Sequence, residues 1–375
     1  MSVQTAHQTV KFIPLEHTSF YDSLRKRVDE YFIKNNISKN YNFSMLQKTI
    51  AMLAMYLVPY FLIVTGVIAG HTFLFFGLWI IMGFGVTGIG ASVMHDSCHG
   101  AYSHNHTVNS LLGGTLNLLG GYSKNWKIQH NILHHTYTNI DGLDEDIDSG
   151  AFLRMSPNQK IQKIHKYQYI YAWFFYSLMN LYWVLAKDYK CLFKYHKLGL
   201  LKKQKISLVR GILEVTFYRA IYIFYLIYLP YLFSGFSIVA IIGGYVIMQM
   251  VAGFTLACVF QLAHVMEECE FPIPSSDHKI NNNWAVHQVL NTADFSPNSK
   301  FLSWYIGGLN FQIEHHLFPH ICHIHYKEIS KIVKATVQEY GLPYNVQPTF
   351  LEALKEHARM LKKLGTAPAV VRATV

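Results

Sequence analysis

Histidines are concentrated in two stretches of this sequence, and their spacing is typical of metal ligands. Of 21 histidines, 15 lie within residues 95–135 and 264–325, which make up about a quarter of the chain. Histidines four residues apart lie on one face of a helix, so two of the clusters can present paired imidazoles. The clustered positions are His95 and His99, then His130, His134 and His135, then His315 and His316, which follow Gln312.

Such clustering favours a metal centre over isolated structural histidines. Neighbouring imidazoles repel one another when protonated, whereas a metal ion holds them neutral and uses their lone pairs. Seven clustered histidines are too many for one zinc ion, which generally takes four ligands, so we expect two metal ions. Imidazole suits iron, copper, zinc and nickel. Iron fits best because, beside lipid and with access to dioxygen, it can attack an unactivated C–H bond, and zinc has no redox chemistry.

Two long uncharged runs supply the elements that position these clusters. Residues 49–95 and 220–266 contain no Asp, Glu, Lys or Arg, and charged residues are only 14% of the chain. Each run is about 70 Å of helix, enough to cross a hydrocarbon core of roughly 30 Å twice. The sequence therefore predicts two transmembrane hairpins, and this composition excludes an ordinary soluble domain.

The position of the clusters fixes the number of crossings. One site requires all three clusters on the same side of the membrane, so the chain crosses an even number of times between His135 and His315. The second hairpin supplies two crossings, and residues 168–186, although apolar, therefore lie in the interface rather than span the bilayer. We expect an all-α integral membrane protein with four transmembrane helices and a helical cap that holds the site.

The predicted organisation is one integrated membrane domain with polar ends. A short amphipathic helix is expected around Tyr21–Ile37, and the two caps follow the hairpins along the chain. The predicted segments are an N-terminal segment 1–48, a membrane domain 49–330 with hairpins 49–94 and 214–260 and caps 95–213 and 261–330, and a C-terminal segment 331–375.

Charge placement predicts the orientation. The net charge is +10, and lysines crowd residues 187–210, while the expected hairpin tips near Gly70 and Gly235 carry no Lys or Arg. By the positive-inside rule the termini and the site are cytoplasmic. We interpret the basic run as a solvated face near anionic lipid head groups, since no motif for nucleic-acid binding accompanies it.

The three clusters resemble those of the membrane-bound, histidine-box fatty acid desaturases. The resemblance covers roughly residues 45–330 and includes the order of the boxes and the hairpin between them. Residues 307–319 (GGLNFQIEHHLFP) are similar to the front-end subgroup, in which glutamine replaces the first histidine of the third box. This resemblance implies an enzyme that inserts a double bond between an existing one and the carboxyl end of an acyl-CoA or lipid-linked acyl chain.

The resemblance also implies the site. It implies two iron ions with dioxygen as co-substrate, and an additional histidine ligand between the second hairpin and the third box, to which we match His264. The implied metal ligands are His95, His99, His130, His134, His135, His264, His315 and His316, with Gln312, Asp96, Asn131, Glu314 and Gln261 expected to orient ligands or to contact the metal through water.

The sequence also bears on the electron donor and on alternative functions. Many front-end enzymes carry a fused cytochrome b5 domain with a His-Pro-Gly-Gly motif, which is absent from this sequence. We therefore expect a separate electron donor, either a ferredoxin or a free cytochrome b5-like protein, and a bacterial inner membrane. One alternative is a lipid or alkane hydroxylase of the same architecture. Another is a non-enzymatic metal-binding membrane protein, although a transporter favours ionisable residues in its spans, and the two uncharged runs have no Asp, Glu, Lys or Arg.

Overall fold

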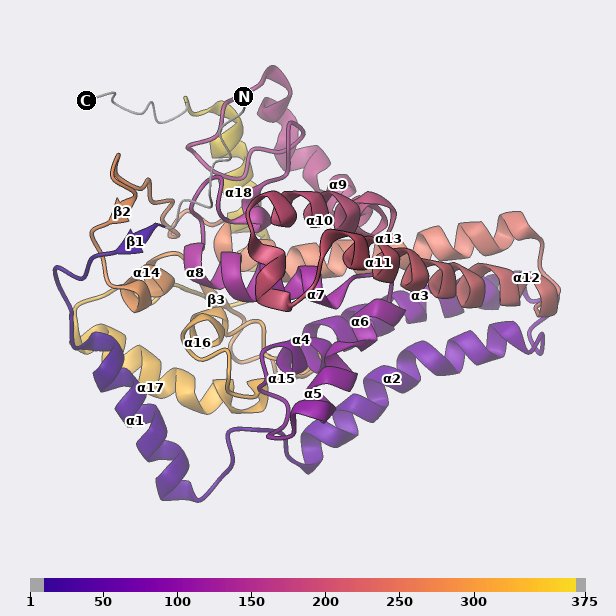
Figure 1. Cartoon of the computed structure of the whole chain (residues 1–375), viewed down its shortest axis with the longest axis horizontal. Coiled ribbons are helices and arrows are strands. Elements are labelled where there is room, and N and C mark those ends of the chain that lie inside the picture. The colour runs from indigo at the N-terminus through magenta and orange to yellow at the C-terminus, as the bar shows by residue number, and fades with distance from the viewer. Residues whose placement is uncertain (1–9, 369–375) are drawn as a thin grey trace. The chain divides into compact units, whose positions relative to one another are not determined.

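The computed structural model describes residues 10–368, and these divide into two compact units that alternate along the sequence. Unit 1 comprises Tyr41–Ile128 and Phe174–Ala257, and unit 2 comprises residues 10–40, Gln129–Trp173 and residues 258–368. Parts of the predicted end segments, residues 1–9 and 369–375, lie outside the described residues. Figure 1 gives the order of the elements along the chain.

Four helical stretches in the described residues are long and apolar enough to cross a membrane, as the sequence predicts. They contain 22, 27, 26 and 27 residues, or about 33 to 40 Å of helix, which exceeds the hydrocarbon thickness of roughly 30 Å. Two of them start before the uncharged runs do. The spans are Phe43–Val64, Thr72–Cys98, Leu208–Phe233 and Ile238–His264.

Helices α2 (Phe43–Val64) and α3 (Thr72–Gly88) run side by side in unit 1 (Figure 1). A glycine allows this close approach, because a Cβ on Gly85 would lie 2.9 Å from the backbone nitrogen of Tyr56. Large apolar side chains on the spans stay exposed, such as Phe73 and Val239, which are 97% and 77% exposed. Such surfaces suit contact with lipid rather than water.

The third span contains a buried charge that the apolar-run argument did not anticipate. Arg219 lies within α11 (Leu208–Ile223), and its Nη2 is 2.6 Å from Oδ2 of Asp188. Asn125 donates a second hydrogen bond to this carboxylate at 3.0 Å. Burial raises the pKa of Asp188, and the guanidinium of Arg219 opposes that rise. The pair allows a charged residue to lie inside a membrane helix.

The apolar segment 168–186 belongs to a helical stretch that is not among the four spans. It consists of α9 (Gln168–Tyr182), the π-helix η5 (Trp183–Lys187) and α10 (Asp188–Lys197). This agrees with the prediction of four crossings.

Unit 2 has an apolar core to which helix α1 (Phe20–Asn35) contributes one face. In α1 the residues Phe20, Leu24, Val28 and Phe32 recur every four positions and are buried. Helix α1 lies beside α17 (Tyr326–Glu339) (Figure 1). The predicted amphipathic helix is therefore confirmed. Two short parallel pairings, β1 (Lys11–Phe12) with β2 (Lys279–Ile280) and β3 (Asp294–Phe295) with β4 (Val346–Gln347), join distant segments.

The remaining elements are short or connect those above. Those that begin in unit 1 are η1 (Ile89–Met94), α4 (His95–Cys98), α5 (His106–Gly113), α6 (Thr115–Leu118), α7 (Ser123–Trp126), η2 (Lys127–His134), η6 (Leu200–Gln204), η7 (Phe224–Tyr228), α12 (Leu229–Phe233) and α13 (Ile238–His264). Those of unit 2 are α8 (His135–Tyr137), η3 (Glu145–Ile147), η4 (Lys163–Tyr167), α14 (Trp284–Leu290), α15 (Lys300–Tyr305), α16 (Gln312–Leu317), η8 (His323–His325) and α18 (Phe350–Thr366).

Candidate metal centre

The first histidine pair lies in unit 1, where the second span ends. His95 begins α4, which continues from the π-helix η1, and His99 is its C-cap residue. Their ring centroids are 4.8 Å apart, and Trp126 contacts both rings at 5.5 and 5.8 Å. The four-residue spacing thus places both imidazoles on one side of the helix.

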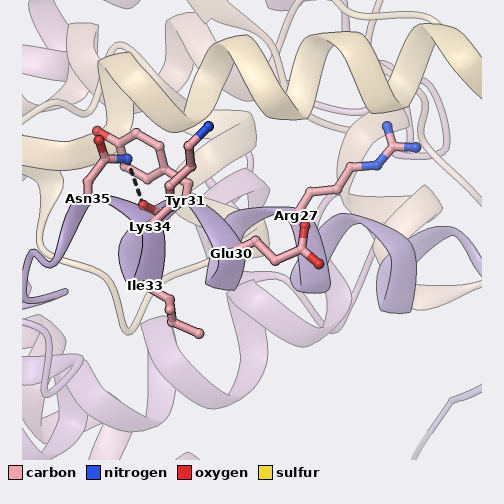
Figure 2. Close-up of a pocket in the computed structure, with 6 residues that line it drawn as sticks. All are labelled: Arg27, Glu30, Tyr31, Ile33, Lys34 and Asn35. Carbon is pink, nitrogen blue, oxygen red and sulfur yellow. Dashed lines mark hydrogen bonds between the residues drawn. The ribbon is translucent and has the colours of Figure 1, made fainter.

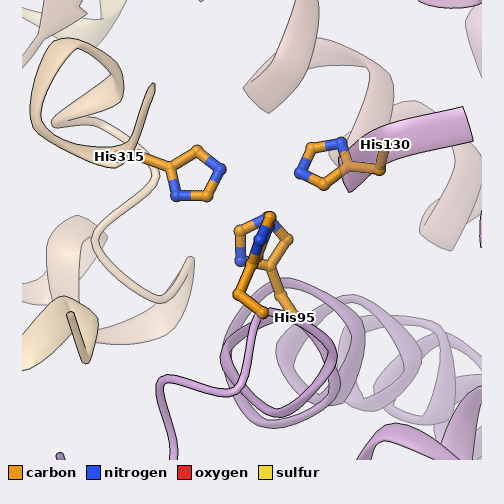
Figure 3. Close-up of side chains that lie close together, drawn as sticks. His95, His130 and His315 are labelled. Carbon is orange, nitrogen blue, oxygen red and sulfur yellow. The ribbon is translucent and has the colours of Figure 1, made fainter. Parts of the chain in front are cut away.

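The other six predicted ligands lie together in unit 2. All are 5% exposed or less, and they come from three segments that are far apart in the sequence. His130 and His315 stack with ring centroids 5.7 Å apart, and Figure 3 shows their rings directed toward each other. The six residues are His130, His134, His135, His264, His315 and His316.

Three of these imidazoles form a tight group with the geometry of a metal site. Ligand atoms of His134, His264 and His316 all lie within 4.8 Å of one another. Within the described residues, Nε2 of His134 and Nε2 of His264 are buried and have no hydrogen-bond partner. A buried polar atom of this kind is costly unless a ligand satisfies it. These residues therefore fit a metal ion, whose bond to each lone pair removes that cost.

The opposite ring nitrogen of each histidine is held by the protein. Nδ1 of His134 lies 3.1 Å from both carboxylate oxygens of Asp144, Nδ1 of His264 lies 3.3 Å from the carbonyl oxygen of Asn291, and Nδ1 of His316 lies 2.8 Å from Oε1 of Gln288. Each acceptor fixes the proton on Nδ1 and leaves Nε2 as the nitrogen that can bind metal.

A second pair of nitrogens has the separation expected of ligands that share an ion. Nε2 of His135 and Nε2 of His130 are 3.2 Å apart. Two nitrogens bound about 2.1 Å from one ion lie about 3.0–3.4 Å apart at octahedral or tetrahedral angles. The ring of His315 lies 4.6 Å from that of His135, and its Nδ1 is 3.1 Å from the hydroxyl of Tyr326. Unit 2 therefore holds more imidazoles than one ion requires.

Carboxylates control the charge of His134. Burial alone would lower its pKa, but the carboxylates of Asp144 and Asp146 outweigh burial and raise the pKa to about 9. Burial likewise favours a raised pKa for Asp144, yet His134 and the backbone N–H groups of Asn139 and Asp146 hold it below the ordinary value. The two carboxylates therefore favour a proton on Nδ1 of His134, and Nε2 is the nitrogen left for a metal ion.

Two glycines shape the approach to the third box. Gly307 and Gly308 have φ angles of +64° and +66°, which side chains rarely adopt. They lie in the turn between α15 and the short helix α16, which carries His315 and His316. A Cβ on Gly308 would also lie 3.0 Å from the Cβ of His323. The carboxylate of Asp294 accepts the N–H of Ile313 at 3.0 Å and so holds the first turn of α16.

The structure also places the five residues expected around the ligands. Nε2 of Gln261 donates to the carbonyl oxygen of Asp146 at 3.0 Å, and Oδ1 of Asp96 lies 4.0 Å from Nδ1 of His95. Glu314 accepts a hydrogen bond from Tyr344 at 3.0 Å, and burial together with nearby Asp294 raises its pKa. Gln312 is buried and Asn131 is half-buried.

Sequence reasoning did not assign the residues that hold the imidazoles. These are Asp144, Gln288, Asn291 and Tyr326, with Asp146 beside His134. The acidic loop at residues 141–148 was the one visible signal, because two carboxylates shortly after a histidine box can orient its imidazoles. The others come from unremarkable segments and are recognised by their contacts alone.

An open depression elsewhere in unit 2 has a different lining. It follows helix α1, has a volume of about 620 Å³ and contains no histidine (Figure 2). The amide of Asn35 donates to the carbonyl oxygen of Tyr31 at its edge. The lining residues are Arg27, Glu30, Tyr31, Ile33, Lys34 and Asn35.

Comparison with known proteins decides the family. The family model for fatty acid desaturases matches residues 71–348, which include every predicted ligand. The chain belongs to the fatty acid desaturase family. It is 38% identical over 360 residues to an sn-1 linoleoyl-lipid 6-desaturase of Arthrospira platensis, with 93% of each chain covered.

Two further relatives agree with this assignment. An acyl-lipid (8-3)-desaturase of Physcomitrium patens is 36% identical, with 95% of this chain and 74% of that protein covered. An sn-1 linoleoyl-lipid 6-desaturase of Synechocystis sp. is 35% identical, with 96% and 99% covered. The predicted resemblance is thus confirmed, and the protein is a fatty acid desaturase, an oxidoreductase of the membrane whose histidine clusters bind metal.

Proposed function

We propose that this desaturase acts on acyl chains of membrane lipids and inserts a double bond between an existing one and the carboxyl end. The observation that carries the proposal is the buried cluster of His134, His264 and His316, whose Nδ1 atoms are held by the protein and whose ligand atoms lie within 4.8 Å of one another. The relatives are named as desaturases of lipid-linked acyl chains. Gln312 at the start of the third box supports the front-end regiochemistry.

We propose two iron ions as the metal. His134, His264 and His316 would hold one ion, and His130, His135 and His315 would serve the second. His95 and His99 carry the same four-residue spacing as the second box, and we assign them to the second ion on that basis. Gln312, Asp96, Asn131, Glu314 and Gln261 remain proposed as residues that orient ligands or contact metal through water.

The iron ions would supply the binding and reduction of dioxygen. Removal of two hydrogens from adjacent methylenes then consumes one dioxygen, two electrons and two protons and releases two waters. The chain's own residues orient the imidazoles, exclude bulk water and position the acyl chain. Asp144 keeps the Nδ1 proton of His134 in place, the buried cluster excludes bulk water, and an apolar tunnel for the acyl chain would fix which carbons face the metal.

The electron donor is proposed to be a separate carrier, either a ferredoxin or a free cytochrome b5-like protein. Exposed lysines of α10 and η6, including Lys194 and Lys202, suit an acidic carrier. The same lysines support a cytoplasmic site and cytoplasmic termini, and we propose a bacterial inner membrane as the location. A periplasmic reporter fused to either terminus that proved active would contradict this orientation.

Lipid analysis tests the proposed function. Cells that express the wild type or His316→Ala are fed mono- and di-unsaturated acids, supplied with ferredoxin and its reductase, and their lipid-bound fatty acids are analysed by gas chromatography with mass spectrometry. A more unsaturated acid, seen with the wild type alone and with the new bond on the carboxyl side, is the expected result. A hydroxylated product would instead assign the hydroxylase reaction. A well-expressed wild type that bound no iron would refute the metal assignment.

A further inference from the structure

Asn139 has an unusual backbone and an unusual number of contacts. It follows the second histidine box by four residues, is fully buried, and has a φ angle of +59°. Asn and Gly are the residues that adopt this left-handed conformation most readily. The conformation therefore explains why the position takes a small polar residue, but glycine would satisfy it equally well. The side-chain amide requires a separate explanation.

The backbone of Asn139 acts on His134. Its N–H donates to Oδ2 of Asp144 at 2.9 Å, and the same carboxylate accepts the Nδ1 proton of His134 at 3.1 Å. The left-handed turn directs this N–H back toward the acidic loop. Asn139 thereby fixes the carboxylate that orients one member of the cluster.

The side chain of Asn139 acts on His264. Its Nδ2 donates to the carbonyl oxygen of His264 at 2.9 Å and to that of Glu270 at 3.1 Å, with a longer contact of 3.4 Å to that of Asn291. The carbonyl oxygen of Asn291 also accepts from Nδ1 of His264 at 3.3 Å. The amide therefore contacts both the backbone of His264 and the group that orients its ring. Carbonyl oxygens only accept, and this fixes which end of the amide faces them.

We propose that Asn139 is a positioning residue that holds His134 and His264 in the relative geometry needed to share one metal ion. The proposal rests on the metal site of the proposed function. Both imidazoles have a buried Nε2 without a hydrogen-bond partner among the described residues, and Asn139 contacts the orienting group of each. Through Asn139 the second box and the end of α13 are set relative to each other before metal binds.

Asn139→Gly is the decisive variant. Glycine keeps the left-handed backbone and the N–H to Asp144 and removes only the amide. The matched control is Asn36→Gly, since Asn36 is an exposed residue with a φ angle of +50° at the end of α1. Full-length protein in detergent is compared for Fe(II) affinity by chelator competition, for the visible spectrum of the Co(II)-loaded form, and for the melting temperature of the metal-free form. Asn139→Asp, which keeps the size but cannot donate to three carbonyls, is the second variant.

The expected result is an Fe(II) affinity about 10- to 100-fold lower in Asn139→Gly, the range usual for residues that orient ligands. Its Co(II) spectrum changes, while Asn36→Gly matches the wild type in both. Unchanged affinity and spectrum in Asn139→Gly overturn the proposal. If neither variant at position 139 folds without metal while Asn36→Gly does, Asn139 is a folding determinant and the proposal is also overturned. A wild type that binds no Fe(II) refutes the proposed function itself, which separates the two outcomes.

Discussion

Two buried carboxylates in different units have opposite roles because their partners differ. Asp144 and Asp188 are each 1% exposed, and each accepts hydrogen bonds from more than one group. Asp144 faces the imidazole of His134, and Asp188 faces the guanidinium of Arg219. An imidazole has a second nitrogen with a lone pair to offer, whereas a guanidinium has none. A buried carboxylate therefore orients a proposed metal ligand in unit 2, whereas in unit 1 it neutralises a buried arginine.

Loss of the His134 imidazole is expected to have the largest effect on desaturation activity. In His134→Ala the proposed iron site loses a ligand, so we expect desaturation to fall below detection and iron per protein to drop. Product analysis by gas chromatography and metal analysis by mass spectrometry measure both. His196→Ala, at an exposed position of α10, is the control and keeps wild-type activity. Near-normal activity in His134→Ala would remove His134 from the metal site.

Loss of the carboxylate of Asp188 is expected to lower the free energy of unfolding. Asp188→Ala leaves the guanidinium of Arg219 buried and unpaired, which costs about 3–5 kcal/mol in the free energy of unfolding. Reversible unfolding in mixed detergent measures it, and iron per folded protein stays at the wild-type value. The double variant Asp188→Leu with Arg219→Met removes both charges and recovers most of the loss. A single variant as stable as the wild type would show that the pair contributes little.

A third buried group, His357, extends the comparison to pH. Its Nδ1 lies 2.8 Å from the carbonyl oxygen of Val265, a neutral acceptor, whereas Nδ1 of His134 faces the carboxylate of Asp144. Burial lowers the pKa of His357 to about 4. Between pH 4 and 6.5 the unfolded chain then binds more protons than the folded one, so the free energy of unfolding falls as pH falls, by about 3 kcal/mol in all.

Melting temperatures of the metal-free protein from pH 8 to pH 4 test this. His357→Gln is expected to flatten the decline, and His196→Gln is expected to leave it unchanged. An equally steep decline in His357→Gln would assign the pH dependence to other groups.

The smallest effect is expected from neutralising Asp144, the carboxylate beside His134. Asp144→Asn keeps the shape but weakens the bond to the Nδ1 proton of His134, so Fe(II) affinity falls about 10- to 100-fold, or about 1.4 to 2.7 kcal/mol. Chelator competition measures it. Asp146→Asn serves as the comparison, since that carboxylate lies farther away, at 3.4 Å, and we expect a smaller loss. Equal losses would show that both carboxylates orient the ring.

The sequence predicts what depends on local patterns. The four spans follow from apolar runs long enough to cross lipid, and the histidine clusters are visible because four-residue spacing is a property of one helix. The start of the third span at Leu208 is not visible in this way. Arg210, Glu214 and Arg219 interrupt its first turns, and Arg219 is accommodated by a carboxylate 31 residues away in sequence.

The residues that hold the imidazoles escape sequence reasoning for a similar reason. Gln288 reaches His316 across 28 residues, and Asn291 reaches His264 across 27. Nothing in the composition of α14 or of the segment after it indicates this role. Such contacts depend on tertiary folding, so a pattern within one segment cannot reveal them.

The π-helix η2 (Lys127–His134) limits how the length of this chain can change. This π-helix carries His130 and His134. A π-helical turn contains about one residue more than an α-helical turn. Deletion of one residue would let the helix return to α geometry, but each residue turns an α-helix by about 100°, and one flank would rotate by that angle against the other. Single-residue insertions and deletions here would therefore misdirect the imidazoles, whereas a loop such as Asp148–Gly150 can absorb them.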